Sequence, residues 1–130
     1  MKRLIFVFFV LVGSFWIISK AEAHEMVPTY PKWEPSYLGD NLVKTTMTMF
    51  NKREEIEYYE IGVFDDNWET IPFVSQYQVL KIPYLSTVTF DVYIRRDDKY
   101  RARYVCSRSK IRKEDLTRTA VSSRICSKFK

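Results

Sequence analysis

Residues 42–50 read LVKTTMTMF, and this stretch decides the fold class. Its side chains alternate in character: one side holds Val43, Thr45, Met47 and Met49, and the other holds Leu42, Lys44, Thr46, Thr48 and Phe50. An alternation of period two with many β-branched residues is typical of a strand. No 3.6-residue period is present here, so the stretch predicts a strand and not a helix.

Two more stretches further along the chain alternate in the same way. In residues 57–65, the side chains expected to face inward are Tyr59, Ile61 and Val63. In residues 87–94, one face of the strand would hold Val88, Phe90, Val92 and Ile94. Strands that recur about every ten residues, with turn residues between them, are typical of all-β sandwiches. We therefore expect an all-β fold, a single immunoglobulin-like antiparallel β-sandwich over residues 24–130.

The segments around these strands are less regular. Prolines crowd residues 28–35, which predicts an edge strand or an extended lead-in because proline cannot donate to a strand ladder. Residues 100–106 alternate as a further strand, and residues 108–118 are so highly charged that we expect a loop. Residues 119–125 alternate again as a last strand, and a helix is the competing interpretation of that stretch.

The first 23 residues have the layout of a secretory signal. Lys2 and Arg3 give a positive start, residues 4–18 are almost entirely apolar, and Ala21-Glu22-Ala23 supplies small residues before a cleavage site. The apolar run is shorter than the ~20 residues that a membrane-spanning helix prefers. We expect a signal peptide over residues 1–23 and export to the periplasm or the extracellular space. An uncleaved membrane anchor is the alternative.

The two cysteines of the chain are Cys106 and Cys126. Outside the cytosol two thiols tend to form one disulfide. This bond would close a loop of about twenty residues and stabilise the fold by about 3 kcal/mol. No histidine or further cysteine stands near either thiol in the sequence, which disfavours a shared metal site. We expect a disulfide between the last two strands, and two free buried thiols are the alternative.

The order of these segments resembles the N-terminal immunoglobulin-like domain of periplasmic fimbrial chaperones. The resemblance covers residues 28–94, from the proline-rich lead-in through a strand ending in Asn51, the YYEIGVFD stretch at 58–65, and VLKIP at 79–83. It implies a sandwich fold and a chaperone-like role. Those chaperones also carry a second domain and hold a subunit's terminal carboxylate in the cleft between their domains. We expect one domain here, so the resemblance implies the fold rather than that site.

Charge is distributed unevenly along the chain. Residues 24–98 contain 13 acidic and 7 basic side chains, whereas residues 99–130 contain 2 acidic and 11 basic ones. The basic C-terminal segment has almost no interleaved aromatic residues for base stacking, so we expect no nucleic-acid partner. We expect it to contact a polyanion or an anionic membrane surface, and a solvated end that keeps the chain soluble is the alternative. Its candidate residues are Arg108, Lys110, Arg112 and Lys113.

His24 is the only histidine, and signal cleavage would make it the first residue. An α-amino group and an imidazole on one residue can chelate Cu(II), and Met26 could add a soft ligand for Cu(I). A small exported copper-binding protein is therefore the alternative function. No second histidine completes such a site, and Met47 and Met49 have the spacing of core residues in a strand. We expect no cofactor, with copper as the alternative.

Aromatic residues make up 16% of the chain, more than a small sandwich core can hold. We expect some of them to form a partner-binding surface. The candidates are Tyr30, Trp33, Tyr37 and Tyr58. Carboxylate pairs such as Asp65-Asp66 fall in predicted turns, where nothing supplies the desolvation that a catalytic acid needs. The sequence thus predicts a non-enzymatic exported module that binds another exported or surface protein, or a copy of itself.

Overall fold

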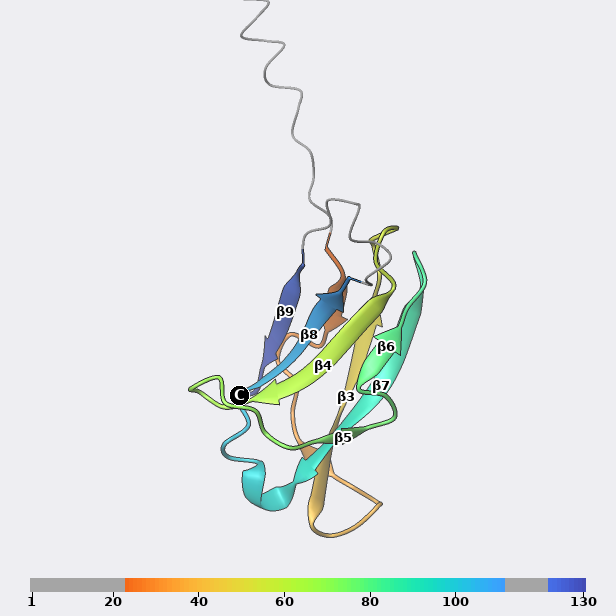
Figure 1. The fold of residues 1–130 in the computed structure, drawn as a ribbon. Coiled ribbons are helices and arrows are strands. Elements are labelled where there is room, and N and C mark those ends of the chain that lie inside the picture. The colour runs from red at the N-terminus through yellow and green to blue at the C-terminus, as the bar shows by residue number, and fades with distance from the viewer. Residues whose placement is uncertain (1–22, 112–121) are drawn as a thin grey trace, which may run out of the picture.

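The computed structural model describes residues 23–111 and 122–130, which form a sandwich of two antiparallel sheets (Figure 1). In the first sheet the strand order is β1-β3-β7-β5 with β2 also beside β3, and in the second it is β6-β4-β8-β9. The strands are β1 Glu25–Val27, β2 Glu34–Pro35, β3 Leu42–Phe50, β4 Tyr58–Phe64, β5 Val74–Ser75, β6 Val79–Lys81, β7 Thr87–Arg95, β8 Tyr104–Lys110 and β9 Arg124–Lys128. The predicted all-β sandwich is confirmed.

The long pairing of β3 with β7 carries one half of the core. Both strands have nine residues and pair over their full length, with Met47 opposite Phe90. Because the side-chain period of a strand is two, alternate residues face the other sheet and leave water together. The predicted inward faces are confirmed: the buried residues include Val43, Thr45, Met47 and Met49 on β3, Tyr59, Ile61 and Val63 on β4, and Phe90, Val92 and Ile94 on β7.

The prediction for the segment that contains β8 is wrong at both ends. The sequence predicts a strand over residues 100–106 and a loop over residues 108–118, whereas β8 spans Tyr104–Lys110. At the start, the backbone N–H of Ala102 donates to the carbonyl of Asp98, and this turn keeps the chain out of the ladder. At the end, the charged side chains point outward and the serines between them point inward, so the charge does not interrupt the strand.

β9 pairs with β8 at the edge of the second sheet. Cys106 lies directly opposite Cys126, and the two form a disulfide across the ladder. The predicted bond between the last two strands is confirmed. Their Cα atoms are 4.1 Å apart, the narrow spacing at which opposed residues turn their backbone N–H and C=O groups away from each other.

Several predictions concern residues outside the described ranges. They are the signal peptide apart from its last residue, the predicted charged loop from residue 112 to residue 118 with its basic residues Arg112 and Lys113, and most of the stretch that could be strand or helix. All of these stay predictions. Within residues 23–111 and 122–130, no helix is long and apolar enough to cross a membrane.

Asn51 fastens the connections at one end of the sandwich, where it is fully buried. Its side-chain amide donates to the carbonyls of Ile56 and Ile82 at 2.7 and 2.8 Å. Its Oδ1 accepts from the backbone N–H of Arg53 at 2.8 Å and from the hydroxyl of Tyr59 at 2.6 Å. This single side chain therefore joins the β3–β4 connection to the segment that follows β6.

Asn51→Ala should lower the free energy of unfolding by about 3 kcal/mol, because several buried polar groups lose their partners without gaining water. Urea denaturation followed by circular dichroism measures the loss. Asn67, whose side chain is exposed, offers a matched control, and Asn67→Ala should change stability by less than about 0.5 kcal/mol. Similar small effects at both positions would show that Asn51 does not hold the connections together.

Candidate functional site

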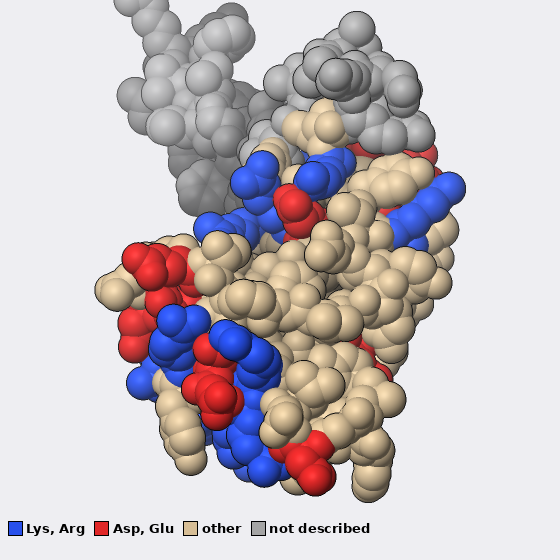
Figure 2. All heavy atoms as spheres, turned by 60° about the horizontal axis from the view of Figure 1, so that its bottom comes forward, with Lys and Arg blue, Asp and Glu red and all other residues tan. Residues whose placement is uncertain are grey.

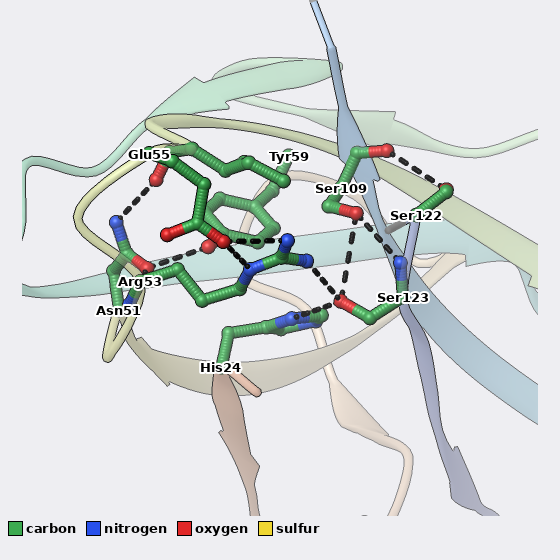
Figure 3. A network of polar contacts seen from close by, with 9 residues as sticks. His24, Asn51, Arg53, Glu55, Tyr59, Ser109, Ser122 and Ser123 are labelled. Atoms are coloured by element: carbon green, nitrogen blue, oxygen red, sulfur yellow. Dashed lines mark hydrogen bonds and ion pairs between the residues drawn. The ribbon is translucent and has the colours of Figure 1, made fainter. Parts of the chain in front are cut away.

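A buried polar network occupies the end of the sandwich at which β3 ends and β9 begins (Figure 3). His24 lies inside it: its Nε2 is hydrogen-bonded to Ser107 Oγ at 2.6 Å and its Nδ1 to Ser123 Oγ at 3.2 Å. The ring centroid of Tyr59 lies 4.5 Å from that of the imidazole. His24 is only 1% exposed, so the structure places it in the interior and not at a free surface.

Arg53 enters the same network from the β3–β4 connection. Its guanidinium donates to Ser123 Oγ at 3.3 Å and forms an ion pair with Glu55 at 2.7 Å. From the second sheet, Ser109 Oγ accepts the backbone N–H of Ser123 at 2.7 Å. The network therefore ties together four segments: the start of β1, the β3–β4 connection, β8 and the start of β9 (Figure 3).

The surroundings of His24 keep it neutral. Burial, helped by the positive charge of Arg53, lowers the pKa of His24 from 6.5 to about 4, and a hydrogen bond with the backbone of Ser107 only partly opposes this. A neutral imidazole has one donor and one acceptor nitrogen, and serine hydroxyls can complement both. Burial also raises the pKa of Tyr59 to about 12. The network is thus one neutral histidine, a protonated tyrosine and one arginine–glutamate ion pair.

A histidine beside serines raises the question of nucleophilic catalysis. A general base works best when its pKa lies near the working pH, and in a catalytic triad a carboxylate orients the imidazole. Here both ring nitrogens face serine hydroxyls, and the pKa of about 4 makes His24 a weak base. The arrangement suits a structural role in closing this end of the sandwich.

The structure places both predicted copper ligands in the interior. His24 is bonded through both ring nitrogens, and Met26 is buried in the core opposite Met49. In the part of the chain that the structure describes, no group of three or more His, Cys, Asp or Glu side chains could hold a metal ion. Copper binding stays a prediction.

The four aromatic candidates are not gathered on one surface. Trp33 stacks on Phe129 with 4.2 Å between ring centroids, and the ring of Tyr30 lies 4.9 Å from the Nζ of Lys130. Tyr37 is fully exposed in the turn before β3. Tyr58 begins β4 at the opposite end of the sandwich (Figure 1).

Among the residues that the structure describes, the uneven charge along the chain is partly balanced in space. Figure 2 shows basic and acidic side chains interspersed over the lower end of the sandwich. Basic residues after residue 98 pair with carboxylates that precede them: Arg101 with Asp98, Arg103 with Asp66, and Lys110 with Glu60. Of the predicted polyanion-binding residues, Arg108 and Lys110 are exposed on β8, and only Lys110 has a carboxylate partner in the described ranges.

A groove with a volume of about 460 Å³ lies on the outer face of the second sheet, and it was not predicted. Arg108 and Arg124 both line it and lie directly opposite each other on β8 and β9. The guanidinium of Arg124 lies 4.6 Å from the ring centroid of Phe64 and 5.1 Å from that of Trp68. Trp68 in turn stacks on Tyr104 at 4.4 Å. An aromatic cluster therefore contacts one of the two arginines that line the groove.

A signal for this arginine pair is present in the sequence. If Cys106 and Cys126 face each other in an antiparallel pair, the residue two positions after the first faces the residue two positions before the second. Those residues are Arg108 and Arg124, and they share a face with the disulfide because the period of a strand is two.

The outer edge of β9 is partly open. The backbone groups of Arg124, Cys126 and Lys128 point away from β8, because these residues alternate with the ones that bond to β8. The N–H of Lys128 donates to the carbonyl of Thr29 at 3.1 Å, which closes that end of the edge. No described residue bonds to the outward backbone groups of Arg124 and Cys126, although β1 lies in contact with β9.

Comparisons with known proteins agree with this architecture. No protein-family model and no curated protein matches the chain. The crystal structure of the E. coli chaperone DraB is similar, with 12% identity, a TM-score of 0.59, and coverage of 82% of this chain and 53% of that chain. The structure of the Salmonella enterica SafA pilin in complex with the SafB chaperone is similar too, with 12% identity, a TM-score of 0.61, and coverage of 85% and 54%.

The chain therefore spans about half the length of the solved chains that it matches. At this level of identity, the likeness concerns the fold. The predicted resemblance to the immunoglobulin-like domain of fimbrial chaperones is confirmed in that sense.

Acid should destabilise the protein through His24. In the unfolded chain the imidazole binds a proton below its ordinary pKa of 6.5, whereas in the folded protein it stays neutral down to about 4. The unfolded state therefore binds more protons in this window, and stability falls as the pH falls through it. Between pH 7.5 and pH 5 the loss from His24 should be about 2 kcal/mol.

His24→Gln should remove most of this pH dependence, because glutamine can hydrogen-bond to serine but does not titrate. Urea denaturation of both proteins at the two pH values measures it. Burial raises the pKa of Glu55, but hydrogen bonds from its own backbone N–H and from Arg53 lower it overall. Glu55 therefore stays ionised at both pH values. Equal pH dependence in the two proteins would contradict a buried, neutral His24.

Proposed function

We propose that this protein is an exported, non-enzymatic module that binds another exported protein by taking one of its strands onto the open edge of β9. The observation that carries the proposal is the outward-facing backbone of Arg124 and Cys126 on an edge strand. An added strand would satisfy these groups with main-chain hydrogen bonds, which is the basis of β-augmentation. The disulfide would hold β9 in the sheet while its outer edge is used.

One neighbour of the edge is β1, which contacts β9, and the Val27 side chain of β1 is 52% exposed. The contact between Thr29 and Lys128 closes only the C-terminal end of β9. The open stretch therefore lies at the Arg124 end, where a partner strand would extend the second sheet.

The similar structures support the class of partner. One is a chaperone, and the other contains a pilin in complex with a chaperone. The predicted signal peptide, the disulfide and this likeness together support a periplasmic or extracellular location. The weak basicity of His24 supports a binding role over a catalytic one. We therefore propose a chaperone-like or assembly function for an exported or surface protein.

Substituting residue 124 with proline or with glutamine distinguishes the contribution of its backbone N–H to binding from that of its side chain. Proline removes the outward N–H, which the ladder to β8 does not use, whereas glutamine removes the charge and keeps the N–H. Tagged wild-type, Arg124→Pro and Arg124→Gln proteins are recovered from the exporting cell, and captured proteins are quantified by mass spectrometry. Arg124→Pro should capture at least about tenfold less of an exported partner than Arg124→Gln does.

The control is Ile125→Pro, which removes an N–H that bonds to β8 and should therefore destabilise the protein. Circular dichroism should show that Arg124→Pro stays folded. Equal capture by Arg124→Pro and Arg124→Gln would contradict strand addition. That result is expected if β9 is a short edge strand whose charged residues keep other strands from pairing with it.

A further inference from the structure

The strongest unexplained feature of the surface is a pair of arginines without a counter-charge. Arg108 and Arg124 are opposed on neighbouring strands, and in such a position like charges destabilise the sheet. Across residues 23–111 and 122–130, no carboxylate forms an ion pair with either guanidinium. An anion between the two side chains would relieve this repulsion.

The other charged groups around the groove do not supply that anion. Glu60 lies opposite Arg108 on the β4 side, but its carboxylate pairs with Lys110 at 3.4 Å. The charged side chains that line the groove are therefore two arginines and one glutamate, and that glutamate is already paired with Lys110. The groove thus keeps a net positive charge.

The aromatic cluster holds Arg124 in position. Its guanidinium lies against both Phe64 and Trp68, which favours cation–π contact and restricts the side chain. Trp68 has a φ of 63°, a conformation that is rare for a bulky residue. The carboxylate of Asp65 holds this turn by accepting the backbone N–H of Glu69 at 3.0 Å. A strained turn thus presents a ring that orients the arginine over the groove.

The groove itself combines this charge with an apolar hollow. Ile61, Gly62 and Cys106 line it from the strands, and Phe73 lines it from the segment that precedes β5. A Cβ at Gly62 would lie 2.7 Å from the ring of Phe64, so the absence of a side chain here lets that ring pack close to the sheet. Both Phe64 and Phe73 line the hollow.

We propose that this groove binds an acidic segment of a partner protein, with an Asp or Glu carboxylate between Arg108 and Arg124 and a neighbouring apolar side chain in the hollow beside Phe73. Guanidinium groups match carboxylates in planar, two-bond geometry. A hollow of about 460 Å³ admits individual side chains, whereas a flat membrane surface cannot enter it. The site lies on the face of the sheet, so it does not depend on strand addition at the edge of β9.

Labelled peptides of defined charge test this site on the whole protein. A decapeptide of alternating Glu and Val is compared with matched Gln/Val and Lys/Val peptides by fluorescence anisotropy. The Glu peptide should bind at least about tenfold more tightly than the Gln peptide, and its affinity should fall as salt is added. Arg108→Gln and Arg124→Gln should each weaken it at least about fivefold. The control Lys32→Gln, which removes an exposed charge outside the groove, should leave it unchanged.

Equal binding of the Glu and Gln peptides, no binding of either, or binding that both arginine variants leave intact would overturn the proposal. Vesicles that contain phosphatidylglycerol form a second arm. If they bind through Arg108 and Arg124 while the Glu peptide does not, the pair serves a membrane surface instead. Arg108→Gln leaves the edge of β9 intact, so failure here is distinguishable from failure of strand addition.

Discussion

The pairing of β9 with β8 is the interaction on which the rest of the site depends. β9 has five residues and one neighbouring strand in its sheet, and the disulfide fastens it at its middle residue. This register brings Ser123 to His24, places Arg124 opposite Arg108, and leaves part of the edge open. A slip of one residue would turn every side chain of β9 to the other face of the sheet. The cross-strand disulfide prevents that slip.

The sheets could be predicted from the sequence because the alternation that forms them is local. Residues 42–50 and 87–94 carry apolar side chains at every second position, and burying that face against a second sheet is their most favourable arrangement. The local pattern does not predict the bounds of β8, because charged residues 108 and 110 lie within this strand. Whether such a segment is extended depends on its neighbours in the sheet, and those come from β4 and β9.

The candidate site was harder still to predict, because its contacts join residues that are far apart in the sequence. The sequence predicts His24 as the first residue after signal cleavage, but it does not predict that its ring is hydrogen-bonded to serines 83 and 99 residues further along the chain. No local sequence pattern predicts contacts between residues that are so far apart in the chain. The pairing of Arg103 with Asp66 likewise cannot be read from charge counts, which predicted a basic end. The opposed arginines differ, because the predicted disulfide already fixes their register.

Residue-resolved amide hydrogen exchange, on the free protein and on its complex with a captured exported partner, tests the open edge most directly. In the free protein the amides of Ile125 and Ser127 should be protected by β8, while those of Arg124 and Cys126 exchange quickly. Binding of the partner should then protect Arg124 and Cys126. A protected Cys126 amide in the free protein, or no change at either residue in the complex, would contradict strand addition at β9.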